Sequence, residues 1–145
     1  MFVYTRLKVN KTVTLEIKLT LNLEELSKIM TTKIYHNPRC SKSRQTLELL
    51  NNEGIETEVI EYLNTPPDAA ALENILNGLG MEPRELMRKG QDEYKTLGLA
   101  DENLSREDLI KAMIENPILI ERPIVITNKG IAIGRPIENI KKILS

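Results

Sequence analysis

Apolar and polar residues alternate strictly along one early stretch of the chain. From Val13 to Leu23 the odd-numbered positions are apolar, and the even-numbered positions between them are polar. A period of two is typical of a β-strand with one buried face. The pattern changes at Met30, so we interpret residues 1–29 as an N-terminal extension. This extension either contributes an extra β-strand or results from a start codon assigned too early, with Met30 as the natural start.

From Met30 onward, short apolar runs alternate with stretches in which apolar residues recur every three or four positions. The short runs predict β-strands, and the longer periodic stretches predict helices. Two helix starts have the spacing of a capping box, Thr65 to Asp68 and Ser105 to Asp108, with Pro66 as the first helical residue of the former. The predicted strands are residues 33–36, 57–62, 124–127 and 131–133. The predicted helices are residues 41–53, 66 to about 79, 83–89, 92–97, 106 to about 116, and one that starts at 136.

These elements occur in the order βαβ, a block of helices, and then ββα. The order predicts an α/β protein with a thioredoxin/glutaredoxin-like fold. In this arrangement a helical insertion lies between the N-terminal βαβ unit and the C-terminal ββα unit. We assign residues 30–145 to this single domain, because no linker or internal repeat interrupts them.

Composition narrows the classes of partner. The 145 residues include 20 basic and 21 acidic side chains, for a net charge of -1, and only five aromatic residues. A nucleic-acid partner usually requires a basic surface or stacking aromatic rings. The balanced charge and the small number of aromatic residues therefore argue against such a partner. No apolar run approaches the ~20 residues of a membrane span. The first ten residues lack the apolar core of a secretory signal, so we expect a cytoplasmic protein without a membrane partner.

The chain contains one cysteine, Cys40, and one histidine, His36. One cysteine cannot form an intramolecular disulfide, and this pair cannot complete the common Cys/His zinc sites, so we predict no metal. Cys40 stands where a helix begins, and helix N-terminal amides lower a thiol pKa from ~8.5 to ~3.5–7.5. The basic residues Arg39, Lys42 and Arg44 argue against a buried, inert cysteine. We therefore interpret Cys40 as a nucleophile.

Other polar residues are candidates to assist the thiol. Ser43 stands where a Cys-x-x-Cys motif has its second cysteine, and we expect its hydroxyl to donate a hydrogen bond to the thiolate. His36 either tunes the potential and moves a proton, or satisfies a backbone group at a strand end. Guanidinium groups match the oxygen pairs of a tetrahedral oxyanion. The arginines beside predicted element ends are Arg88, Arg122 and Arg135, although spacing alone favours surface charges.

Residues 31–145 resemble the glutaredoxin-linked arsenate reductase family throughout their length. Several motifs recur in order along one chain, which makes the resemblance specific. The segment Pro-Arg-Cys-Ser-Lys-Ser-Arg is similar to the signature of the arsenate reductase-like branch. The matching segments are Ile34-Tyr-His-Asn-Pro-Arg-Cys-Ser-Lys-Ser-Arg44, Tyr62-Leu-Asn-Thr-Pro-Pro67, Glu85-Leu-Met-Arg-Lys89, Leu97-Gly-Leu-Ala100, Asn116-Pro-Ile-Leu-Ile-Glu-Arg-Pro-Ile124 and Gly134-Arg-Pro136.

The resemblance implies a function and a role for each candidate residue. Cys40 corresponds to the nucleophile, His36 to the histidine near the thiol, Ser43 to the thiolate-bonding serine, and Pro123 to a cis-proline. The implied reaction is reduction of arsenate to arsenite, with glutathione as a co-substrate, no bound cofactor, and glutaredoxin as the partner that reduces a mixed disulfide. The family's three oxyanion-binding arginines correspond to Arg88, Arg122 and Arg135.

Two alternative functions stay open at this point. The chain could be a glutathione-linked thiol oxidoreductase that acts on another substrate, because an arginine triad does not distinguish arsenate from another small oxyanion. A Spx-type regulator that binds RNA polymerase shares the fold and a stretch like Arg122-Pro-Ile124. Such regulators typically carry a Cys-x-x-Cys switch, whereas this chain has Cys40-Ser-Lys-Ser43, and they usually lack the Arg-Pro found at Arg135.

Overall fold

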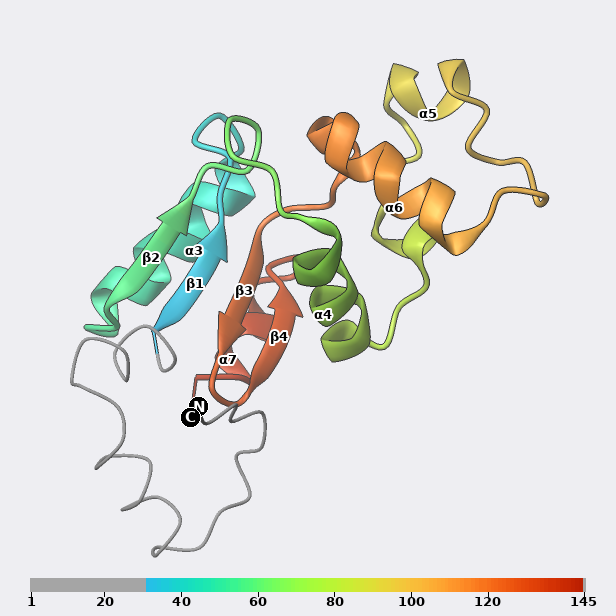
Figure 1. The fold of residues 1–145 in the computed structure, drawn as a ribbon. Helices are drawn as coiled ribbons and strands as arrows, with labels where there is room; N and C mark the ends of the chain where they lie inside the picture. Colours follow the sequence, from blue (N-terminus) through green and yellow to red (C-terminus); the bar gives the residue numbers. More distant parts are fainter. Residues whose placement is uncertain (1–30, 145) are drawn as a thin grey trace, which may run out of the picture.

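The protein is described by a computed structural model that covers residues 31–144. The strand predicted between residues 12 and 23, and the whole N-terminal extension, lie outside the described residues. Within them, four strands form one mixed sheet in the order β2-β1-β3-β4, as Figure 1 shows. β1 is parallel to β2, and β3 is antiparallel to both β1 and β4. The strands are β1 (Thr32–Tyr35), β2 (Thr57–Ile60), β3 (Ile124–Thr127) and β4 (Gly130–Ile133).

Helices cover both faces of the sheet. Successive strand residues point to opposite faces, so Ile34 packs with α3 (Ser41–Asn52) and α7 (Glu138–Lys141), while Tyr35 packs with α4 (Ala69–Leu79). The view in Figure 1 places α7 behind β3 and β4, and α4 in front of them. Val125 and Ala132 lie on the same face as Ile34, whereas Ile124 and Ile133 lie on the same face as Tyr35. Two apolar cores therefore fix the sheet between its helices.

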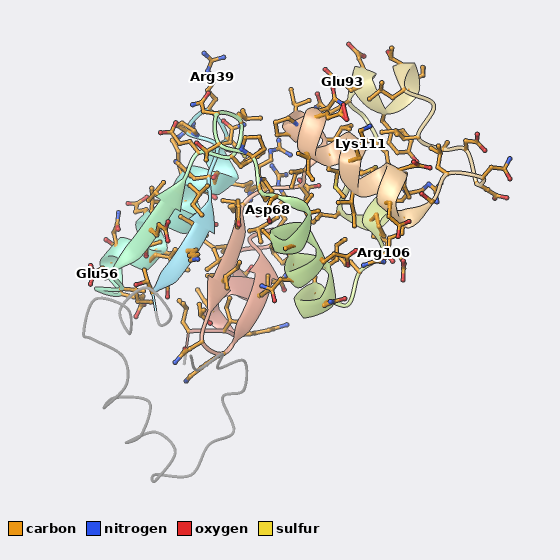
Figure 2. All side chains as sticks on the ribbon, viewed as in Figure 1. Arg39, Glu56, Asp68, Glu93, Arg106 and Lys111 are labelled. Carbon is orange, nitrogen blue, oxygen red and sulfur yellow. The ribbon has the colours of Figure 1, made fainter. Side chains whose placement is uncertain are left out.

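The segment between α4 and β3 is the predicted helical insertion. Its longest helix buries Leu109 and Met113 in the same core as α4. Arg106, labelled in Figure 2, binds Glu73 of α4 at 2.8 Å and Glu82 at 3.0 Å. The insertion consists of η1 (Pro83–Leu86), α5 (Asp92–Thr96), α6 (Arg106–Glu115) and η2 (Pro117–Leu119). The α/β thioredoxin/glutaredoxin-like fold with a helical insertion is confirmed.

The N-terminus of α4 differs from the prediction. Asp68 is its N-cap, and the Asp68 carboxylate accepts a hydrogen bond from the Ala71 N–H at 2.8 Å. The capping box predicted at Thr65, with Pro66 as the first helical residue, is therefore wrong. The physical reason is Pro67, whose ring disfavours the helical conformation in the residue before it. In the structure the helix begins at Ala69, after both prolines.

The other predicted helix ends agree with the structure in part. The capping box at Ser105 is confirmed, because Ser105 and Asp108 exchange both of its side-chain-to-backbone hydrogen bonds. The helix predicted at residues 83–89 is a 3₁₀ turn that ends at Leu86. The final helix begins at Glu138, two residues after the predicted start at Pro136. These short elements have few residues in which a helical period can be recognised.

Candidate active site

Cys40 lies at the edge of the sheet where β1 and β2 end and β3 begins. It is the N-cap residue of α3 and has an extended backbone conformation. The backbone N–H groups of Lys42 and Ser43, in the first turn of α3, lie close enough to its sulfur to lower the pKa of the thiol. Arg135 Nη2, from the loop after β4, donates to Cys40 Sγ at 3.3 Å. The thiol is therefore buried under donors from both the local helix and a distant segment.

Opposing effects set the pKa of this thiol. Burial raises the pKa of Cys40, but the Ser43 backbone N–H, the Arg135 guanidinium, the positive charge of Arg122 and the Lys42 backbone N–H lower it. The net result is a pKa below the ordinary value of 9.0. A lowered pKa increases the fraction of thiolate, the nucleophilic form, at neutral pH. The surroundings of Cys40 therefore favour its nucleophilic form.

The side chain of Ser43, in the first turn of α3, contacts that of His36, in the loop that precedes the thiol. Both are buried, and His36 Nδ1 lies 2.6 Å from Ser43 Oγ. The same hydroxyl accepts a hydrogen bond from the Asn37 N–H at 3.0 Å. These two contacts connect α3 to the loop that leads to Cys40. The hydrogen bond from the Ser43 hydroxyl to the thiolate stays a prediction.

His36 is held in its neutral form by its surroundings. Burial lowers the pKa of His36 below 6.5, the nearby Glu61 carboxylate raises it, and the Arg44 guanidinium lowers it. At the end of β1, the His36 backbone N–H also donates to the Ile60 carbonyl of β2 at 2.8 Å. This pairing anchors the loop that leads to Cys40.

Backbone pairing brings Arg88 close to Arg122. The Arg88 N–H donates to the Leu119 carbonyl at 2.7 Å, and the Glu121 N–H donates to the Leu86 carbonyl at 2.8 Å. These bonds join the end of η1 to the segment that leads into β3. Two arginines that are distant in sequence are thus fixed on adjacent segments of the chain.

The three candidate arginines share one electrostatic environment. Burial lowers the pKa of Arg88, and the positive charges of Arg122 and Arg135 lower it further. Arg122 acts on the thiol through its charge, and Arg135 contacts the sulfur directly. The spacing alone had favoured surface charges, but in the structure Arg122 and Arg135 act on the thiol, and Arg88 interacts electrostatically with both of them. Together they form a positive site that suits an anion.

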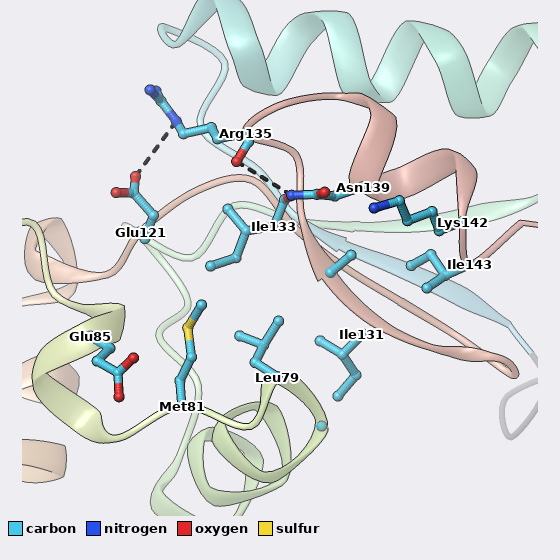
Figure 3. A pocket seen from close by; sticks show the side chains of 12 residues that line it. Leu79, Met81, Glu85, Glu121, Ile131, Ile133, Arg135, Asn139, Lys142 and Ile143 are labelled. Atoms are coloured by element: carbon cyan, nitrogen blue, oxygen red, sulfur yellow. Dashed lines mark hydrogen bonds and ion pairs between the residues drawn. The ribbon is translucent and has the colours of Figure 1, made fainter.

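Glu121 offsets part of this positive charge. Its Oε1 accepts a hydrogen bond from Arg122 Nη1 at 2.9 Å and lies 3.6 Å from Arg135 Nε. Figure 3 shows Glu121 and Arg135 joined at the rim of a neighbouring pocket, with Leu79 and Met81 below them. Sequence reasoning did not single out Glu121. Its only signal was its position directly before Arg122.

Gly134 allows the loop after β4 to approach the thiol. Its N–H donates to the Pro123 carbonyl at 2.9 Å. A Cβ atom on residue 134 would lie 2.5 Å from Thr46 Oγ1 and 2.8 Å from Pro123 Cγ. Only glycine therefore fits at this contact, directly before Arg135. The Arg122–Pro123 bond is cis, as the resemblance implied, and so is the Arg135–Pro136 bond, which was not predicted.

Sequence reasoning also missed Tyr62, which lies in the turn after β2. The side chain is fully buried, and the charges of Arg122, Arg88 and Cys40 act on its hydroxyl. A tyrosine directly after a strand that ends at the site edge was the available signal.

Among residues 31–144, no three His, Cys, Asp or Glu side chains are arranged to hold a metal ion. None of the helices described here has the length and apolar character needed to cross a bilayer. The Cys40 thiol is free.

Comparison with known proteins relates the whole described domain to one family. The ArsC family model matches residues 35–143, which include every candidate site residue. An Escherichia coli K12 protein named uncharacterised protein YfgD is 58% identical over 113 residues, covering 77% of this chain and 95% of that protein. An arsenate reductase of Neisseria meningitidis serogroup B is 51% identical over 113 residues, covering 77% and 97%. The solved structure of an arsenate reductase from Vibrio cholerae is 49% identical, with a TM-score of 0.76 and coverage of 79% and 98%. The chain belongs to the ArsC family.

Proposed function

We propose that this protein reduces arsenate to arsenite through the Cys40 thiolate, with glutathione as co-substrate and glutaredoxin as protein partner. The relatives named arsenate reductase support the substrate. One observation carries the proposal: Arg135 Nη2 lies 3.3 Å from Cys40 Sγ, in the same electrostatic environment as Arg88 and Arg122. An oxyanion bound by these arginines has its central atom next to a nucleophile.

The arginines bind the substrate and stabilise the reaction. Guanidinium groups form paired hydrogen bonds with the oxygens of a tetrahedral anion. As the thiolate approaches, negative charge accumulates on those oxygens, and fixed cations offset it without rearranging. Glu121 holds Arg122 and Arg135 in place before the substrate binds.

The first chemical step forms a bond between sulfur and arsenic. The Cys40 thiolate attacks arsenic, and one As–O bond breaks. The departing oxygen takes up a proton and leaves as water. Arsenic stays in the +5 state in this adduct, because the step is a substitution.

The second step needs a thiol from another molecule, because the chain contains no other cysteine. Glutathione thiolate attacks the Cys40 sulfur, and an S–S bond forms as the S–As bond breaks. The electron pair of the broken bond stays on arsenic, which becomes arsenite in the +3 state. A glutaredoxin thiolate then attacks the glutathione sulfur of the mixed disulfide, and Cys40 leaves as a thiolate.

Ser43 and His36 act in this scheme by positioning the thiol. Their 2.6 Å contact and the Asn37 N–H fix the loop before α3 against the helix whose first backbone N–H groups lower the pKa of the thiol. Neutral His36 leaves the positive charge of the site to the arginines.

A coupled assay tests the proposed reaction. Arsenate, glutathione and glutaredoxin are supplied together, and the oxidation of glutathione is followed through glutathione reductase. We expect turnover that needs all three components and that falls at least about 1,000-fold in Cys40→Ser, which loses the nucleophile. The circular dichroism spectrum of Cys40→Ser should match that of the wild type. Turnover near the wild-type value in Cys40→Ser would contradict the mechanism, and thiol exchange without arsenate reduction would favour the alternative oxidoreductase.

A further inference from the structure

Tyr62 has a buried hydroxyl without a hydrogen-bond partner. The side chain is 0% exposed, and its Oη makes no hydrogen bond in the structure. The Asn37 side-chain amide lies close enough to lower the pKa of the phenol, but not in hydrogen-bonding geometry. Buried hydroxyls are almost always paired, because an unpaired one loses its hydration without compensation. This unpaired hydroxyl is unusual for a folded core.

The charges of the thiol and of two arginines reach the Tyr62 hydroxyl. Burial raises the pKa of Tyr62 above 10.0, the charges of Arg122 and Arg88 lower it, and the charge of Cys40 raises it. The Tyr62 ring also packs in one core with Met87 and Ile120, which lie close in sequence to Arg88 and Arg122. The raised pKa keeps the proton on that oxygen at neutral pH, so Tyr62 is available as a hydrogen-bond donor.

Arg122 carries a second unpaired donor in the same region. Its Nε is buried and makes no hydrogen bond, although its Nη1 binds Glu121. Two buried, unpartnered donors thus come from separate segments of the chain, and both residues interact electrostatically with Cys40. The oxygens of a tetrahedral oxyanion could accept hydrogen bonds from both of them.

We infer that the Tyr62 hydroxyl donates a hydrogen bond to an oxygen of the oxyanion bound by Arg88 and Arg122. The inference rests on the proposed function and adds a neutral donor to its three cations. The aromatic ring is packed in the apolar core that contains Leu72 and Ile75, so the position of the hydroxyl is fixed. A fixed donor orients the anion, whereas the charges of the arginines mainly attract it.

Calorimetric titration of arsenate into Cys40→Ser protein tests this inference without turnover, because that variant has no thiol to react. Arsenate is titrated into the full-length Cys40→Ser chain, and into the same chain with Tyr62→Phe or Tyr35→Phe added. Tyr35 is a matched control, because it is also buried in this core but its phenol is subject to the charges of Asp68 and Glu58. We expect Tyr62→Phe to raise the Kd for arsenate about tenfold or more, as for loss of a hydrogen bond to a charged group. Tyr35→Phe should leave the Kd unchanged.

Thermal unfolding without arsenate separates a binding role from a structural one. Tyr62→Phe keeps the ring and removes an unpaired hydroxyl, so its Tm should equal or exceed that of the parent. A lower Tm would show that the hydroxyl stabilises the fold, and would overturn the inference. Equal arsenate affinity in the Tyr62→Phe and Tyr35→Phe proteins would overturn it and leave the proposed function intact. Failure of the Cys40→Ser parent to bind arsenate would overturn both.

Discussion

At the scale of single residues, the reactivity of Cys40 results from opposing contributions. Burial disfavours its thiolate, and four donors or charges favour it. Two of these, the amides of Lys42 and Ser43, belong to the helix that Cys40 caps, so the sequence around the cysteine could predict them. The other two, Arg122 and Arg135, come from distant segments. Their contribution depends on the fold and could not be derived from local sequence.

Arg135→Gln should raise the pKa of the Cys40 thiol. The substitution removes the 3.3 Å hydrogen bond to the sulfur and one positive charge. Alkylation by iodoacetamide follows the thiolate fraction and rises with pH through the thiol pKa. The midpoint of this profile should therefore move to higher pH, and the rate at pH 7 should fall about tenfold, as for loss of a hydrogen bond to a charged group.

Arg39→Gln is the control for that measurement. Arg39 is close to Cys40 in sequence, but its side chain is exposed and points away from the molecule in Figure 2. Its removal should leave the profile unchanged. Identical profiles for both variants would show that Arg135 does not stabilise the thiolate.

At the scale of elements, hydrophobic periodicity predicted the sheet and the longer helices. Strands β1, β3 and β4 each contribute to two cores, as at Ile34 and Tyr35, and each long helix contributes apolar side chains to one of them. Local turn chemistry was less reliable, because two sequences with the same capping-box spacing behave differently. Ser105 caps α6, whereas two prolines move the start of α4 from Thr65 to Asp68. Backbone restrictions imposed by proline outweighed the side-chain pattern.

Asp68→Ala should lower the free energy of unfolding by about 1 kcal/mol, the usual cost of losing an N-cap. Its carboxylate accepts a hydrogen bond from the Ala71 N–H at 2.8 Å, and alanine cannot replace this acceptor. Thr65→Ala, at the other end of the predicted box, should change stability by less than about 0.5 kcal/mol. Urea unfolding of the two variants measures both values. Greater destabilisation by Thr65→Ala than by Asp68→Ala would favour the predicted capping box over the observed cap.

At the scale of the whole molecule, the fold assembles the site from five separate segments. They are the loop after β1, the turn after β2, the end of η1, the segment before β3 and the loop after β4. The cysteine loop could be recognised from sequence, because its residues are contiguous. The arginines were selected by family resemblance, since their spacing carried no signal. Tyr62 and Glu121 were missed because their position depends on where strands end, and the role of residues 1–29 stays a prediction.

The distribution of charge also belongs to the whole molecule. The chain has a net charge of -1, yet Arg122 and Arg135 act on the thiol, Arg88 interacts with both of them, and Glu121 offsets part of their charge. Net charge therefore did not reveal a local preference for anions. A positive site on a nearly neutral protein can attract a small anion without general affinity for polyanions.

The central claim is that the Cys40 thiolate attacks an oxyanion held by arginines. The most direct test is to measure two rates in the Arg122→Ala variant. The kcat/KM for arsenate in the coupled assay reports both binding and attack, whereas iodoacetamide alkylation reports only the reactivity of Cys40. Arg122 acts on the thiol through its charge but does not contact the sulfur, so the alkylation rate at pH 7 should fall only a few-fold. The kcat/KM for arsenate should fall about 100-fold, as expected when an ionic hydrogen bond to the reacting anion is lost. Equal losses in the two rates would contradict the account, because Arg122 would then tune the thiol without holding the substrate.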